Sequence, residues 1–219
     1  MMQTAISQTK PESPVQSGGA LLIVLSAPSG GGKTTLCNQL LASNPNITRA
    51  VTCTTRSPRA GEKDGVDYFF LDTATFQRRV EAGDFLEHAN VYGNHYGTLK
   101  SEVVTSLRSG KDVLLAIDVQ GAAAVRAEAR RDTNLASALM TVFLTPASMT
   151  ILKERLERRG QDKPEVIQKR LAVARQEIAQ WREFDYLIIS TTVAEDLRRM
   201  QAVLEAEKMR QCRATPPEL

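Results

Sequence analysis

The chain has 219 residues, of which 42% are apolar, 24% charged and 5% aromatic, as is typical of one compact domain with small insertions. Its formal net charge of +3 excludes a general basic protein that coats nucleic acid. The longest apolar runs, at 20–25 and 113–117, are far shorter than the roughly 20 residues of a membrane span, so we expect a soluble protein with no nucleic-acid or membrane partner.

The two ends of the chain differ in composition from the rest. Residues 1–19 are rich in Ser, Thr, Gln and Pro and contain no apolar stretch of signal-peptide length, which favours a disordered tail. Residues 211–219 predict a second short tail. The three cysteines, Cys37, Cys53 and Cys212, have no CxxC spacing, which indicates neither a disulfide framework nor a zinc site. We therefore expect a cytoplasmic protein.

Short aliphatic runs that alternate with helical patterns predict an α/β fold with a mostly parallel sheet. The predicted buried strands are residues 21–25, 113–117, 140–144 and 186–189. The predicted helices contain residues 36–41, 149–156, 166–178 and 197–204. Gly160 is expected to end the second helix and Pro164 to begin the third.

Two segments interrupt this alternation. Residues 49–98 are rich in Thr, Arg, Gly, Asp and Tyr and contain a predicted strand at 68–71 and a predicted short helix at 76–80, which indicates a small inserted subdomain. Residues 153–175 contain eight basic and four acidic side chains, so this segment alone carries +4. The positive charge of the chain is therefore concentrated here.

Residues 26–35, with the sequence S-A-P-S-G-G-G-K-T-T, follow the first predicted strand and precede a helix, as a phosphate-binding loop does. Backbone N–H groups and the positive end of the helix would bind a polyphosphate, Lys33 would reach its β and γ phosphates, and the Thr34 hydroxyl would ligate Mg²⁺. The predicted triphosphate-binding residues are Ala27, Pro28, Ser29, Gly30, Gly31, Gly32, Lys33, Thr34 and Thr35. Ala27 stands where the pattern usually has glycine, a minor difference because alanine is small. The alternative, a glycine-rich turn with a surface lysine, fits this order of strand, loop and helix less well.

Residues 54–62 place Arg56 and Arg59 three residues apart on a turn that contains Pro58. Two planar guanidinium groups could hold a phosphate dianion from two sides, and the Tyr68 and Tyr96 hydroxyls could add neutral donors. On their own, these arginines would fit a solvated turn equally well, and the tyrosines would fit a packing role.

Five motifs in chain order resemble those of the guanylate kinase family: T-T-R-x-P-R-x-G-E, D-Y-F-F, F-L-E, G-N-x-Y-G-T and I-D-x-Q-G. The resemblance covers about residues 20–210. It implies a three-layer phosphate-loop kinase fold with a parallel core sheet, and transfer of the γ-phosphoryl group of ATP to GMP, and also to dGMP. The implied parts are a core of residues 20–48, 99–152 and 173–210, a GMP-binding subdomain of 49–98 and an arginine-rich lid of 153–172.

The resemblance also implies which residues bind GMP. The residues that would grip its phosphate are Arg56, Arg59, Tyr68 and Tyr96, assisted by Thr52. Glu87 would read guanine, with Thr98 and Asp118 beside it. Guanine presents N1–H and N2–H₂ side by side, and one carboxylate can accept from both, whereas adenine places an acceptor at N1. Each hydrogen bond to a charged group contributes about 1.5–3 kcal/mol, so the loss of two predicts hundredfold to ten-thousandfold discrimination.

In the lid, the resemblance implies that Arg159 and Arg170 contact the transferring phosphoryl group and that Arg155 contacts ATP. We expect direct in-line attack by a GMP phosphate oxygen on the γ-phosphorus of Mg·ATP, without a covalent intermediate. The groups that would neutralise developing charge are Lys33, Arg56, Arg159 and Arg170. A solvated amphipathic helix is the alternative, and it fits Lys153 and Arg158 well.

The sequence departs from the family pattern at two places. Ala116 stands where a second acid is usual, and residues 190–192 replace a motif with Asn and Asp, so metal and adenine contacts there are in doubt. One rival interpretation is a binding module without catalysis. Such modules typically have a degraded phosphate loop, whereas residues 30–34 of this chain are intact. Another is a related kinase with a different acceptor, for which Glu87 would have no role in reading a base. A homo-oligomer also stays open.

Overall fold

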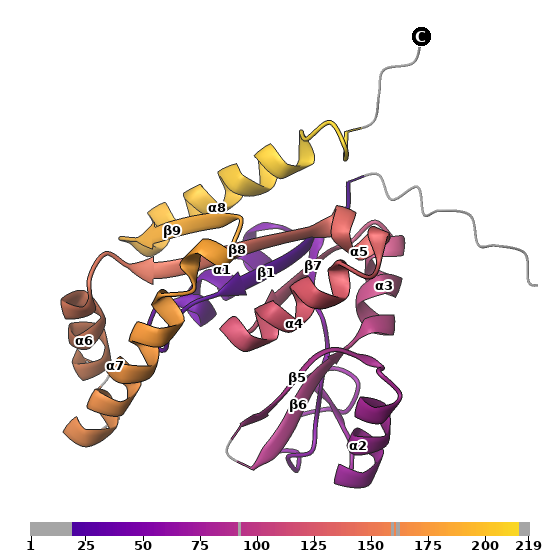
Figure 1. Ribbon diagram of the computed structural model, residues 1–219, viewed down its shortest axis with the longest axis horizontal. Helices are drawn as coiled ribbons and strands as arrows, with labels where there is room; N and C mark the ends of the chain where they lie inside the picture. The colour runs from indigo at the N-terminus through magenta and orange to yellow at the C-terminus, as the bar shows by residue number, and fades with distance from the viewer. Residues whose placement is uncertain (1–18, 92, 159, 161–162, 215–219) are drawn as a thin grey trace, which may run out of the picture.

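The computed structural model describes residues 19–91, 93–158, 160 and 163–214 (Figure 1). These residues form a five-stranded sheet in the order β2-β7-β1-β8-β9 and a four-stranded sheet in the order β4-β3-β6-β5. Figure 1 shows the four-stranded sheet below the larger one and, to the left of the smaller sheet, the pair of helices labelled α6 and α7. The predicted α/β fold is confirmed.

All neighbouring strands of the larger sheet are parallel. Its strands are β1 (Leu22–Ser26), β2 (Ile47–Arg49), β7 (Asp112–Ala116), β8 (Leu139–Pro146) and β9 (Tyr186–Ser190). Four of them match the predicted aliphatic runs. The sequence analysis missed β2, because its three residues, Ile-Thr-Arg, are too few to show a hydrophobic pattern.

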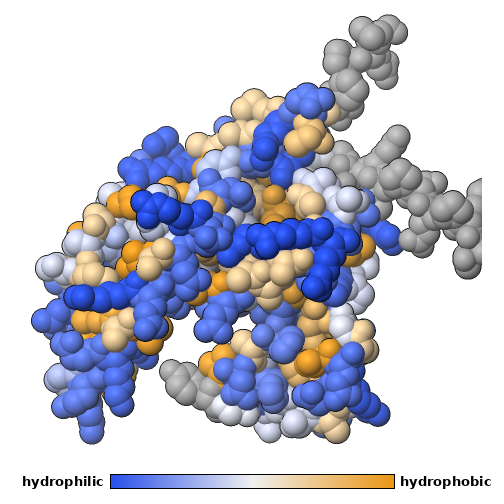
Figure 2. Space-filling model, in the orientation of Figure 1, coloured by the Kyte–Doolittle hydropathy of each residue, from blue (hydrophilic) through white to orange (hydrophobic). Residues whose placement is uncertain are grey.

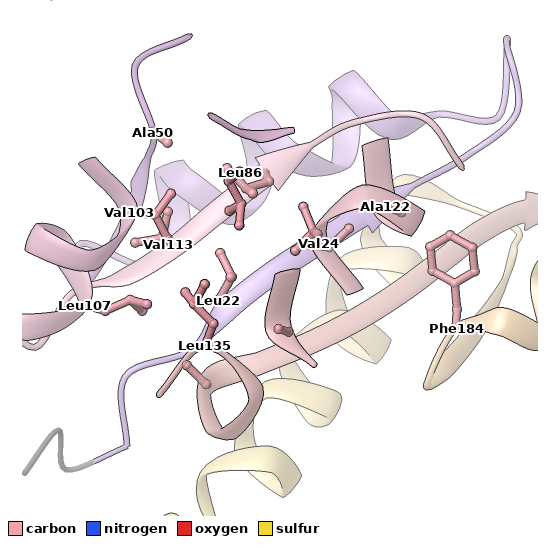
Figure 3. Close-up of a cluster of buried hydrophobic side chains, with 14 of the residues drawn as sticks. Leu22, Val24, Ala50, Leu86, Val103, Leu107, Val113, Ala122, Leu135 and Phe184 are labelled. Atoms are coloured by element: carbon pink, nitrogen blue, oxygen red, sulfur yellow. The ribbon is translucent and has the colours of Figure 1, made fainter. Parts of the chain in front are cut away.

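Helices cover both faces of this sheet. Alternate residues of the central strand β1 point to opposite sides and are apolar on both, so each face must be buried. Leu22 and Val24 face α3 (Lys100–Arg108), α4 (Val119–Ala129) and α5 (Thr133–Ala138), as Figure 3 shows. Ile23 and Leu25 pack with residues of α1 (Lys33–Ser43) and α8 (Val193–Lys208). Trp181, in the short 3₁₀ helix η1 (Trp181–Glu183), packs against the first of these clusters. In the described part of the chain, no helix has the length and apolar character to cross a bilayer.

The smaller sheet has its own apolar cluster. Its elements are β3 (Thr52–Thr54), β4 (Tyr68–Phe70), β5 (Phe85–Val91), β6 (Asn94–Leu99) and the helix α2 (Thr73–Glu81). Phe76 of α2 is fully buried and stacks on Phe85, with ring centroids 4.5 Å apart. The predicted strand at 68–71 and helix at 76–80 are confirmed, and β3, β5 and β6 are additions.

The helices α6 (Met149–Arg158) and α7 (Pro164–Ile178) pack against each other through Leu152, Leu156, Ile167 and Ala174. Proline at the first helical position opens α7, as predicted, because its ring fixes a helical φ and its missing N–H would have no partner there. Gly160, just after α6, has φ of 61°, a left-handed conformation that ends a helix easily only at glycine. The expected lid boundary at residue 172 falls inside α7, which is one continuous helix.

One buried carboxylate joins three elements of the core. Asp112, at the start of β7, is 1% exposed and accepts the N–H of Leu21 at 2.9 Å. It also accepts from Nζ of Lys208, the last residue of α8, at 2.6 Å. A buried carboxylate is tolerated only when such donors replace water, so this contact ties α8 to the start of the central strands.

We therefore expect Asp112→Ala to lower the free energy of unfolding by about 2–4 kcal/mol, because it leaves a buried N–H without its acceptor and Lys208 without its counter-ion. Asp112→Asn retains an oxygen for Leu21 and should cost clearly less. Chemical denaturation of both variants measures the difference, with Glu165→Ala on the exposed start of α7 as control. Equal stability of Asp112→Ala and the parent protein would contradict this role.

Candidate active site

The glycine-rich loop connects the end of β1 to the start of α1. Gly30 and Gly32 have φ of 88° and 103°, in the left-handed region where side chains are strained. A Cβ on Gly31 would lie 2.9 Å from the carbonyl oxygen of Pro28, which is too close. Gly32 is the N-cap of α1 and has no side chain to bond the first N–H groups of the helix. These groups are left for an anion, as the sequence predicts.

Lys33 is the first residue of α1, and its amine bonds to a backbone carbonyl and lies near two carboxylates. Its Nζ donates to the carbonyl oxygen of Ile117 at 2.8 Å. Burial lowers its pKa, while the negative charges of Asp118 and Glu177 oppose that shift. A neutral carbonyl is a weak partner for an ammonium group, so an incoming phosphate oxygen could replace it.

Glu177, near the end of α7, contacts the same loop. Its Oε2 accepts the N–H of Ser29 at 3.4 Å, and burial raises its pKa. The sequence analysis missed this residue, because a glutamate beside an apolar residue in a helix has no distinctive pattern. Glu177 therefore bonds to the loop that the sequence predicts to bind phosphate.

A cavity of about 440 Å³ lies beside the loop, within the size range of small-molecule sites. The residues that line it come from the loop, α1, α6, the end of β9 and the start of α8: Gly30, Gly32, Thr35, Leu36, Arg155, Arg158, Ser190, Thr191, Thr192, Val193 and Asp196. The predicted contact residue Arg155 is thus brought to the loop. Arg158, which fits a solvated helix in the sequence, also lines this cavity.

Five of the residues predicted to bind GMP lie on one face of the smaller sheet. Tyr68, Thr52, Thr98 and Glu87 are neighbours in register across β4, β3, β6 and β5, and therefore form one row. Tyr96 is two residues from Thr98 along β6 and shares that face. The alternate residues, among them Cys53, Phe69 and Leu99, supply the apolar cluster on the other face.

Glu87 is 7% exposed, and each of its oxygens has a defined neighbour. Oε1 accepts from the Thr98 hydroxyl at 2.7 Å. Oε2 approaches α4 so closely that a Cβ on Gly121 would lie 3.2 Å away. Burial raises the pKa of Glu87, the Thr98 hydroxyl opposes the shift, and the charge of Asp118 adds to it. Asp118 itself caps α4 and accepts the N–H of Gly121 at 2.8 Å. The predicted trio is therefore brought together at the start of α4.

Arg56 lies beside the two tyrosines of this face. Its guanidinium carbon is 5.3 Å from the centre of the Tyr68 ring, which in turn lies 6.3 Å from that of Tyr96. Its Nη2 donates to both carboxylate oxygens of Glu62, at 2.8 and 2.9 Å, and Nη1 donates to the Ser57 carbonyl. This pairing raises the pKa of Arg56 and lowers that of Glu62.

Glu62 also accepts the backbone N–H of Arg59 at 2.7 Å, so one carboxylate shapes the whole arginine turn. The Arg59 side chain is exposed. Glu62 holds the arginine turn together, and the sequence analysis quoted it in a motif without giving it a role. The signal available in the sequence was an acidic residue close to Arg56, six positions further along the chain, with which the arginine could pair.

The remaining predicted residues lie at the start of α1 and in the helix pair. Thr34 is exposed in the first turn of α1, where its hydroxyl can ligate a cation that also binds phosphate oxygens. No group of three or more His, Cys, Asp or Glu side chains among the described residues could hold a metal, and a phosphate-loop site requires none. Arg170 lies half-buried in α7. Arg159 lies outside the described residues.

The two sets of residues converge at one edge of the core. The charge of Lys33 lowers the pKa of Glu87, so the loop and the polar face are within electrostatic range. Figure 2 shows the surface indented between the helix pair and the smaller sheet. A phosphate loop at the carboxyl edge of a parallel sheet, beside a second polar site on an inserted sheet, defines a phosphate-loop kinase with two nucleotide sites.

Comparison with known proteins gives the particular family. The family described as "Guanylate kinase" matches residues 20–207, so the chain belongs to the guanylate kinase family. Guanylate kinases from Alkalilimnicola ehrlichii and Maricaulis maris are 45% and 42% identical to it, over 89% and 88% of this chain and 93% and 86% of theirs. The crystal structure of guanylate kinase from Anaplasma phagocytophilum has a TM-score of 0.67 and 34% identity, with 90% of each chain covered.

The buried Glu87 carboxylate predicts a pH-dependent gain of stability in Glu87→Gln. Because the folded protein raises this pKa, stability is lost as pH rises from the ordinary range of a glutamate through the raised value. We expect the variant to melt at a higher temperature than the parent at pH 8, and the difference to shrink as the pH falls through that range. A change of about 1 kcal/mol shifts Tm by about 2–4 °C in a domain of this size, so thermal melts measure it. A difference independent of pH would contradict the prediction.

Proposed function

We propose that the chain carries out its family's reaction, transfer of the γ-phosphoryl group of ATP to GMP, in the indentation between the smaller sheet and the helix pair. The observation that carries this proposal is the meeting of the phosphate loop with Glu87 at one edge of the core sheet, since a kinase must bring donor phosphate and acceptor together. The resemblance to the family makes dGMP an expected acceptor as well. The free thiols of Cys37, Cys53 and Cys212 support a reducing compartment, and we place the reaction in the cytoplasm.

In the donor site, the phosphates of ATP bind to the N–H groups of the loop, and Lys33 exchanges the Ile117 carbonyl for phosphate oxygens. Arg155, beside the loop, contacts the nucleotide from the cavity. Thr34 would hold Mg²⁺, which would neutralise phosphate charge when it is bound with ATP. Glu177 leaves the Ser29 N–H when a phosphate arrives, because two anions cannot share one donor site.

In the acceptor site, Arg56, Arg59, Tyr68 and Tyr96 bind the GMP phosphate, with Thr52 in the same row of the sheet. A guanidinium has five N–H donors, so Arg56 can bind phosphate while Glu62 and Ser57 hold its orientation.

Glu87 accepts hydrogen bonds from N1–H and N2–H₂ of guanine. Its position supports this role, because Thr98 holds one oxygen and Gly121 leaves room beside the other. Asp118 lies beside it at the start of α4.

The chemistry is in-line attack by a GMP phosphate oxygen on the γ-phosphorus, which requires positive charge and the exclusion of water. Lys33 and Arg56 approach from the core and the smaller sheet, and Arg159 and Arg170 from the lid. For the two lid arginines, the support is the resemblance to the family. Closure of the lid would exclude water, which otherwise competes as acceptor.

The assignment of Glu87 predicts the acceptor preference. With ATP as donor, GMP and dGMP should be phosphorylated, and AMP and UMP should react far more slowly. Glu87→Gln should lower kcat/KM for GMP about hundredfold or more, because its amide N–H₂ faces the guanine donors, with KM for ATP nearly unchanged. Glu81→Gln, an exposed glutamate in α2, is the matched control. Equal loss for ATP and GMP would refute the role of Glu87.

The assignment of Lys33 predicts a loss of turnover. Lys33→Ala removes the charge that stabilises the transferring phosphoryl group, so kcat should fall at least about hundredfold. Lys153→Ala, on the exposed side of α6, should leave kcat within about twofold of the parent, since surface charges contribute little. An ATP-coupled assay measures both, and near-normal turnover of Lys33→Ala would rule out the mechanism.

A further inference from the structure

A buried carboxylate forms part of the wall of the donor cavity. Asp196, in the first turn of α8, is 6% exposed. Its Oδ2 accepts from the Ser190 hydroxyl at 2.7 Å, and its Oδ1 accepts the N–H of Thr191 at 3.0 Å. Asp196 thus binds the end of β9, in the segment where the sequence departs from its family's pattern.

The Ser190 hydroxyl connects this carboxylate to Arg155. A hydroxyl has one hydrogen to donate and two lone pairs with which to accept. Because its hydrogen is directed to Asp196, its lone pairs are free to accept from Nη1 of Arg155, which lies at 3.0 Å. Without Asp196, the hydrogen could rotate toward the guanidinium and the contact would become repulsive. Asp196 therefore determines that Ser190 acts as an acceptor.

This arrangement holds Arg155 beside the phosphate loop. Nη1 lies 4.0 Å from the place a Cβ on Gly32 would occupy, and Nη2 contacts the Thr191 carbonyl at 3.5 Å. These two contacts use two of the five guanidinium donors, so three are left for a ligand in the cavity. The long side chain is also fixed before the ligand arrives.

We propose that Asp196 is a positioning residue for ATP: acting through Ser190, it fixes Arg155 beside the phosphate loop and so increases the affinity for the donor nucleotide. The inference rests on the assignment of this cavity to ATP proposed above. Asp196 is largely buried at the cavity wall and both of its oxygens are bonded to the end of β9, so its effect on the nucleotide is expected to pass through Ser190 and Arg155. Its removal should therefore affect KM for ATP and leave KM for GMP unchanged.

The test is steady-state kinetics of Asp196→Asn, with ATP and GMP varied in turn. KM for ATP should rise about three- to tenfold, the factor expected for one weakened hydrogen bond, while kcat and KM for GMP change less than about twofold. Glu195→Gln is the matched control, because Glu195 is also an acid in the first turn of α8 but binds Arg198 and Arg199. It should leave both KM values unchanged. A rise in both KM values in Asp196→Asn, or an equal rise in the control, would overturn the proposal.

The double variant Asp196→Asn/Arg155→Ala separates the proposal from the assignment of the site. Arg155→Ala should raise KM for ATP, and Asp196→Asn should add nothing further in that background. An additional full effect would overturn the link through Arg155. If Arg155→Ala raises KM for ATP and Asp196→Asn does not, the positioning role is wrong and the donor site stands. If Arg155→Ala leaves KM for ATP unchanged, the cavity is not the ATP site. Ser190→Ala breaks the same link without touching the carboxylate, and it decides the question if Asp196→Asn fails to fold.

Discussion

The parallel strands of the core sheet all end at the same edge, and the donor site depends on that constraint. The phosphate loop follows β1, and Ile117 and Asp118 follow β7. The helix α6 follows β8, and Ser190 ends β9. Side chains from four separate parts of the chain therefore meet without long connections, because parallel strands place every departure point side by side. The smaller sheet adds its polar face where β5 packs against α4.

The site contains buried or half-buried charges of both signs, and each has an internal partner in the structure. Lys33 binds the Ile117 carbonyl, Glu87 binds the Thr98 hydroxyl, and Glu177 accepts the Ser29 N–H. Such contacts limit the desolvation cost of these charges, but neutral partners compensate it only in part. The substrates offer stronger partners, since phosphate oxygens suit Lys33 and the guanine N–H groups suit Glu87. The binding of each nucleotide thus exchanges weak internal contacts for charge-assisted ones.

The features that could be predicted from the sequence are those that a short stretch of residues determines. The aliphatic runs of the core and the glycine-rich loop are visible in the sequence, because burial on both faces and a tight turn each restrict composition. The short strand β2 has three residues, and the exposed half of β5 and β6 is polar, so neither shows a periodic signal. The row from Tyr68 to Glu87 exists only through the register of four strands, which the sequence does not state. Glu62 and Glu177 bond to backbone N–H groups that only the folded chain brings to them. Residue type alone therefore did not identify Glu177 or give Glu62 a role.

The departures at 116 and 190–192 follow the same physical logic. Ala116, at the end of β7, packs against the apolar cluster on the α1 side of the sheet, so the negative charge near Lys33 comes from Asp118 and Glu177. At 190–192, hydroxyl residues replace larger polar groups, and a carboxylate from the first turn of α8 accepts hydrogen bonds from the Ser190 hydroxyl and from the Thr191 backbone N–H. A short hydroxyl alone could not fix the orientation of a guanidinium, since its hydrogen rotates freely. The buried Asp196 removes that freedom, and one carboxylate in the wall of the donor cavity therefore orders its neighbours.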